Sequence, residues 1–109
     1  MFKIEKNPTF AHEVKVQVPV DGGFETQSFK ARFKLLTADA LAEYDTSTTA
    51  GMNTFLKDVV VDLEDIVDDN NEPVPFSDRL RDQVIGSLPA LNALFNTYIS
   101  ACSQARLGN

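Results

Sequence analysis

The 109-residue chain contains no tryptophan, one cysteine and one histidine. A single cysteine cannot form an internal disulfide, which agrees with a reducing compartment. Because Cys102 lies in an apolar helical stretch, we expect it to be a small buried hydrophobic residue. One histidine without a cysteine cluster leaves too few nitrogen and sulfur ligands for a transition-metal site. His12 and the serines match no nucleophile signature, so we expect His12 to be a solvated residue on an edge strand. The sequence therefore predicts no enzyme, no catalytic residue and no cofactor.

Long apolar runs and concentrated positive charge are also missing. No stretch has the length needed to cross a bilayer, and the amino terminus lacks the apolar region of a signal peptide. The chain has 16 acidic and 10 basic side chains, and the acidic excess falls after residue 36. Nucleic-acid binding needs a basic surface, so this balance argues against it. We expect a protein of a reducing, cytoplasmic compartment with no membrane or nucleic-acid partner.

Alternating apolar residues dominate the stretch from Val14 to Leu35. Such alternation predicts strands with one buried face, and the Asp21-Gly22-Gly23 break between two alternating runs predicts a β-hairpin over about residues 12–36. The residues expected to face inward are Val14, Val16, Val18, Val20, Phe29, Ala31, Phe33 and Leu35.

The remainder of the chain has the three-and-four spacing of amphipathic helices. The sequence predicts four helices at about residues 38–45, 50–62, 77–86 and 88–107. The β-branched run Val59-Val60-Val61 leaves the end of the second helix open, and the alternative is a change from helix to strand near Leu63. The predicted fold is α+β, with an antiparallel hairpin packed on a small helical bundle in one domain of residues 1–109.

The basic residues Lys30, Arg32 and Lys34 alternate along the second predicted strand. They form either a solvated strand face or a surface that contacts acidic groups, from the acidic half of this chain or from another subunit.

The acidic segment 65–75 is rich in turn-forming residues. Asp68, Asn70 and Glu72 alternate as the ligands of a calcium loop do, but Pro73 and Arg79 stand where that loop needs its glycine and its closing glutamate. We therefore expect a solvated acidic turn, and the sequence predicts no metal site.

Three blocks of sequence, taken in order, resemble one known family. They are Val16–Gly23 leading into Phe29–Phe33, then Phe55–Val61 followed by Glu72–Ser77, and finally Leu88–Tyr98. In this order and spacing they are similar to the tail assembly chaperones of long-tailed, lambda-like phages and prophages, over nearly the whole chain.

The resemblance implies a protein of the bacterial host cytoplasm that binds the phage tape measure protein, keeps it soluble and helps recruit tail tube subunits, yet is absent from the finished virion. In that family a ribosomal frameshift often gives a longer form, and this chain would be the short one. The alternative is a small structural component of the head–tail joint or tail end.

Such a chaperone needs a surface for its client. If the two long predicted helices line a binding groove, the candidate residues are Met52, Phe55, Phe95 and Tyr98, and the last helix is also a candidate surface for self-association. The competing interpretation is that these side chains fill the core, since a small domain needs most of its large hydrophobic residues inside.

Overall fold

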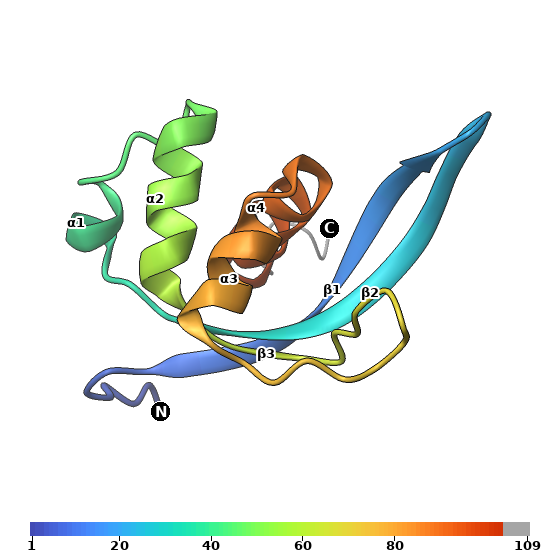
Figure 1. Cartoon of the computed structure of the whole chain (residues 1–109). Coiled ribbons are helices and arrows are strands. Elements are labelled where there is room, and N and C mark those ends of the chain that lie inside the picture. The colour runs from blue at the N-terminus through green and yellow to red at the C-terminus, as the bar shows by residue number, and fades with distance from the viewer. Residues whose placement is uncertain (104–109) are drawn as a thin grey trace.

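One antiparallel sheet and one layer of helices form the fold (Figure 1). The computed structural model describes residues 1–103. The sheet contains β1 (Thr9–Val20), β2 (Gly23–Lys34) and β3 (Val60–Glu64) in the order β1-β2-β3. The helices are α1 (Ala38–Leu41), α2 (Thr49–Val59), α3 (Asp78–Ile85) and α4 (Leu88–Cys102), and all lie on the concave face of the sheet. The predicted α+β class is confirmed.

The hairpin begins three residues before the predicted range of 12–36 and ends two residues before the end of that range. Its strands pair from Thr9↔Lys34 to Val20↔Gly23 around the turn at Asp21-Gly22, where Gly22 has a φ of 79°. Only glycine adopts such a φ readily, which explains the glycine at this position. The tip projects beyond the helices (Figure 1), so Val20 remains exposed although its alternation predicted an inward position. Leu35 is exposed for a related reason, since it lies past the last residue of β2.

The helix predicted over 50–62 ends earlier, at Val59, and the chain continues directly as β3. The β-branched residues Val59-Val60-Val61 favour this change, and β2 offers backbone partners along its second edge. Asp62 faces Arg32 and Val60 faces Phe33, so Val61 is an extra residue that forms a bulge.

The other predicted helices agree with the structure in place but not always in length. Ser77 caps α3 by accepting a hydrogen bond from the Leu80 N–H, and Thr37 caps α1 in the same way. The helix predicted over 38–45 consists of only one turn, α1. The end predicted for the last helix, residues 104–107, lies outside the described residues.

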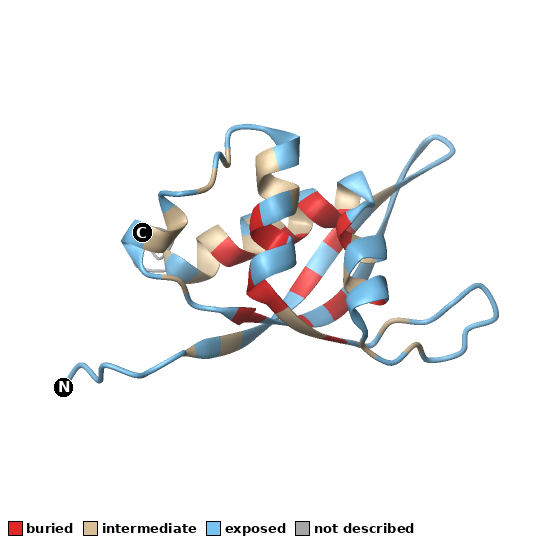
Figure 2. Cartoon of the chain, turned by 60° about the vertical axis from the view of Figure 1, so that its left-hand side comes forward, coloured by how far each residue is buried: buried red, intermediate tan, exposed pale blue. Residues whose placement is uncertain are grey.

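The core lies between the sheet and the helices (Figure 2). The alternating residues Val14, Val16, Phe29, Ala31 and Phe33 are buried as predicted, and they meet the apolar faces of the helices. The helical contribution comes from buried Phe55, Leu56, Val59, Leu80, Ile85, Ala90, Leu91, Leu94 and Tyr98.

Tyr98 connects the helical layer to the end of β2. Its hydroxyl donates a hydrogen bond to the Lys34 carbonyl at 3.1 Å and accepts one from the Leu36 N–H at 3.0 Å. Its ring packs on Phe10, Phe33 and Phe55, with centroid distances of 5.0–5.6 Å. These contacts fix α4 at the point where the chain leaves the sheet.

Cys102 is exposed, which corrects the expectation that it is buried. It is the last residue of α4 and, with Phe10, Leu35 and Ala101, borders an open apolar depression of about 410 Å³. Partial desolvation raises the pKa of its thiol, which keeps the thiol protonated and less reactive at neutral pH.

We expect Tyr98→Phe to lower the free energy of unfolding by about 1–3 kcal/mol, because the substitution leaves the Lys34 carbonyl and Leu36 N–H without their partner. Urea denaturation measures the change. Tyr44→Phe is the matched control with a smaller loss, since the Tyr44 hydroxyl lies in an exposed hydrogen bond. Equal midpoints for Tyr98→Phe and the unmodified chain would contradict this role.

Gly51 lies where the 45–48 turn packs against the first turn of α2, and a Cβ there would be 1.7 Å from the Asp45 carbonyl oxygen. Alanine normally favours a helix over glycine by about 1 kcal/mol. We nevertheless expect Gly51→Ala to destabilise the protein by about 1–3 kcal/mol through this overlap. Gly23→Ala, with no atom within 4 Å of its Cβ, is the control. A thermal melt that showed Gly51→Ala to be the more stable protein would refute the expectation.

Candidate binding grooves

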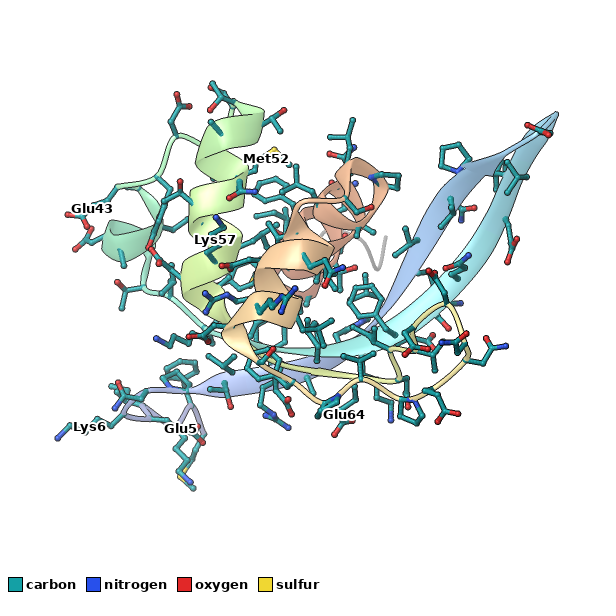
Figure 3. All side chains as sticks on the ribbon, in the orientation of Figure 1. Glu5, Lys6, Glu43, Met52, Lys57 and Glu64 are labelled. Atoms are coloured by element: carbon teal, nitrogen blue, oxygen red, sulfur yellow. The ribbon has the colours of Figure 1, made fainter. Side chains whose placement is uncertain are left out.

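The structure brings three of the four predicted partner-binding residues, Phe55, Phe95 and Tyr98, together, and two of them, Phe55 and Tyr98, belong to the core. Phe55 packs on Tyr98 at a centroid distance of 5.0 Å and on Phe95 at 5.9 Å. Phe55 is 0% exposed and Tyr98 is 2% exposed. Met52 and Phe95 are half-buried at the margin of this cluster, and Figure 3 shows Met52 near the outer end of α2. Met52 and Phe95 are therefore the two candidates whose side chains reach the surface.

A groove that the sequence did not single out lies beside the projecting hairpin. We call it the hairpin groove. It has a volume of about 520 Å³ and runs between the distal part of β1 and β2 and the segment 65–71, and the ends of α3 and α4 close it. Its apolar lining consists of Val16, Val18, Phe29, Ile66, Val67, Val84 and Ala90. Val67 is 53% exposed, so this groove presents a large apolar side chain to solvent.

Asp68 organises the segment that forms one wall of the hairpin groove. Its Oδ1 accepts hydrogen bonds from the N–H groups of Asn70 at 2.8 Å and Glu72 at 3.0 Å. A bridge between Val67 and Pro73 closes the turn, and Asn71 at the tip has a φ of 61°. The carboxylate thus fixes a turn, as expected of an Asx residue. Within residues 1–103 no group of three or more His, Cys, Asp or Glu side chains could hold a metal ion.

The charges around the hairpin groove have one sign. Glu25 and Asp65 line it, Asp68 lines the adjoining hollow of about 230 Å³ next to Val67, and the lining of both contains no lysine or arginine. The surface is therefore an apolar floor with an acidic rim. Sequence periodicity could have identified Val18, whose alternation continues past the end of the helical layer, but not its partners from residues 66, 67 and 84.

A second groove follows the free edge of β1. We call it the edge groove. It has a volume of about 620 Å³, with Glu13, Lys15 and Gln17 on the strand side and Pro89, Asn92, Ala93, Asn96, Thr97 and Ser100 on the α4 side. His12 also lines it, and its Nδ1 lies 2.7 Å from the Glu13 carbonyl oxygen. His12 is exposed on an edge strand, as predicted.

The basic stripe of β2 faces acidic residues of β3. Lys30 pairs across the strands with Glu64, and Arg32 pairs with Asp62. Figure 3 shows Glu64 on the side of the sheet away from the helices. Lys30, Arg32 and Lys34 are all exposed. The stripe is therefore a solvated strand face, and two of its three residues lie opposite acidic residues of the protein's own β3.

Two further findings bear on function. None of the helices in the described part of the chain is both long and apolar enough to cross a bilayer. Comparison with known proteins found no matching family model, no similar curated protein and no similar solved structure.

Tyr44 packs on Phe55 beside the predicted α2–α4 surface, and its hydroxyl has a raised pKa. Its hydroxyl donates a hydrogen bond to the Asp58 carboxylate, which, with some desolvation, raises the pKa of Tyr44 to about 12. Since the pKa is higher in the folded protein, this contact stabilises the fold below pH 10 and its contribution disappears as the pH rises through about 12.

We expect tyrosinate absorbance to rise well above pH 10, because burial also raises the pKa of Tyr98. Asp58→Asn should return the Tyr44 transition toward pH 10, whereas Asp69→Asn in the exposed turn should not. A spectrophotometric titration that gave the same curve for Asp58→Asn and the unmodified chain would contradict the assignment.

Proposed function

We propose that this chain is a tail assembly chaperone of a long-tailed phage or prophage. In this role it binds the tape measure protein, keeps it soluble and helps recruit tail tube subunits, and it does not remain in the virion. The family assignment rests on the resemblance of the three sequence blocks. The observation that supports a binding role is the hairpin groove, an open surface with seven apolar lining residues and acidic residues beside them.

The lining of the hairpin groove suits one class of ligand. An amphipathic helix buries its apolar face in such a groove through side chains spaced one turn apart. The acidic rim favours a helix that carries lysine or arginine beside this apolar face. A tape measure protein is long and largely helical, so it offers repeated segments of this kind while it waits for the tube.

The overall charge fits the same role. The chain has a formal net charge of −6 at neutral pH. Several copies bound along one client would repel one another and keep the complex soluble. The proposed activity is therefore stoichiometric binding, with no reaction step.

The test is co-expression with the long helical protein encoded just downstream, followed by a solubility assay and a pull-down. We expect the partner to be insoluble alone and to co-purify with this chain. Val67→Asp places a charge on the apolar floor, so it should weaken binding at least about tenfold. Val20→Asp, at an exposed valine outside the groove, is the matched control.

The same assay separates the groove from the surface predicted by the sequence. If Met52→Glu abolishes binding while Val67→Asp does not, the client lies against α2 and α4 instead. A partner whose solubility is indifferent to this chain would contradict the chaperone proposal. Detection of the chain in purified particles would favour the alternative, a structural component of the joint or tail end.

A further inference from the structure

The backbone of β1 presents an unpaired edge. The Leu35 N–H donates to the Pro8 carbonyl at 2.9 Å, which continues the β1–β2 pairing by one step. Because hydrogen-bonded pairs alternate in an antiparallel ladder, the even-numbered residues of β1 bond to β2 and the odd-numbered ones direct their N–H and C=O groups outward. The outward residues are Thr9, Ala11, Glu13, Lys15, Gln17 and Pro19, of which Pro19 has no N–H to offer.

The opposite edge of the sheet is protected, in contrast. β3 has only five residues, and the Asp62 carboxylate accepts the N–H of Leu63 at 2.9 Å. Short edge strands and side chains that occupy edge donors are the usual means of preventing strand addition. β1, in contrast, has 12 residues. Within the described chain, His12 is the only side chain that contacts an outward backbone group between Ala11 and Gln17, namely the Glu13 carbonyl.

The helix beside this edge carries no charge. The 15 residues of α4, Leu88–Cys102, include no Asp, Glu, Lys or Arg, although 24% of the whole chain is charged. Its surface in the edge groove consists of small or uncharged side chains, including Asn92, Ala93 and Asn96. Depletion of charge is typical of the centre of protein interfaces.

The charges on β1 allow two copies of this strand to pair with opposite charges facing each other. Glu13 and Lys15 lie on the same face, two residues apart. If two β1 strands pair antiparallel about a twofold axis through Val14, Glu13 of each copy faces Lys15 of the other. Shifting the axis to residue 13 opposes two glutamates, and shifting it to residue 15 opposes two lysines. If the axis lies between two residues, the pairing is displaced by one residue, and the apolar side chains of the two copies then lie on opposite faces of the sheet. Charge therefore selects one register among its neighbours.

We propose that this chain forms a homodimer in which the two β1 strands pair antiparallel around Val14, so that two three-stranded sheets become one continuous sheet. The α4 helices then lie on the same side of that sheet and cover the junction with their uncharged faces. Lys15 would oppose strand addition by an unrelated chain, whereas a second copy supplies Glu13 for it. This inference does not depend on the proposed chaperone function, and its test needs no client.

Sedimentation equilibrium of the full chain from micromolar to millimolar concentration is the first measurement, and we expect a monomer–dimer equilibrium. Glu13→Lys and Lys15→Glu each turn two attractive pairs into repulsive ones, so each should weaken dimerisation about tenfold. Lys57→Glu, on the exposed face of α2, is the charge-matched control and should leave the equilibrium unchanged.

Mixing the two single variants makes the test specific for contacts between copies. A chain with lysine at both positions faces a chain with glutamate at both, so the mixture should regain a dimer at least as tight as the original. The double variant Glu13→Lys/Lys15→Glu should also regain it. A chain that remains monomeric at millimolar concentration, or single variants that dimerise as well as the unmodified chain, would overturn the proposal.

Cross-linking tests the register itself. In a Cys102→Ser background, Glu13→Cys mixed with Lys15→Cys should give the mixed disulfide on mild oxidation. Opposed residues in a hydrogen-bonded pair have Cα atoms about 5.5 Å apart, which a disulfide can span. Predominant joining of residue 13 to 13, or of 15 to 15, would refute pairing around Val14.

Discussion

The Tyr98 hydroxyl sets the position of the helical layer on the sheet. It is part-buried and satisfies both the Lys34 carbonyl and the Leu36 N–H, the backbone groups on either side of the point where β2 ends. Phenylalanine has the shape to fill this site but cannot satisfy these groups, and a polar group left unpaired in a buried place is costly. The chain therefore needs a tyrosine in the carboxyl-terminal part of α4. Its two hydrogen bonds fix this part of α4 against the end of β2.

Both grooves follow from that position. With α4 fixed at Tyr98, its amino-terminal end reaches the distal hairpin, and Ala90 closes one side of the hairpin groove. A different face of the same helix, with Asn92 and Asn96, lies beside β1 and forms the edge groove. The two grooves share no lining residue, so occupation of one leaves the side chains of the other in place.

The sequence predicted the hairpin because a period of two is a local signal that only a half-buried strand produces. It could not settle where α2 becomes β3. The spacing of Phe55, Val59 and Leu63 would continue the helix, whereas the β-branched run Val59-Val60-Val61 favours a strand. The second edge of β2, where Phe33 lies opposite Val60, provides the partner that decides it. A boundary fixed by such a distant partner leaves no local mark in the chain.

The candidate site was harder for a related reason. Helical spacing marks Phe55 and Tyr98 as apolar-facing, but it does not say whether the apolar face meets the protein's own sheet or a client. The structure places both in the core. The residues that form the hairpin groove come from β1, β2, α3, α4 and the segment 65–71. Charge was more informative, because the sequence already marked β2 as basic and the later half of the chain as acidic, and the structure places Lys30 opposite Glu64.

The two proposals together have a consequence for binding a long helical client. A dimer formed at the edge groove leaves both hairpin grooves open, and the twofold axis places them at opposite ends of one continuous sheet. A client with repeated amphipathic segments then binds a second groove within the same complex, at a high effective concentration. Under the proposed chaperone role, weak affinity for each segment would be sufficient for retention and would still allow release, segment by segment, as tube subunits assemble.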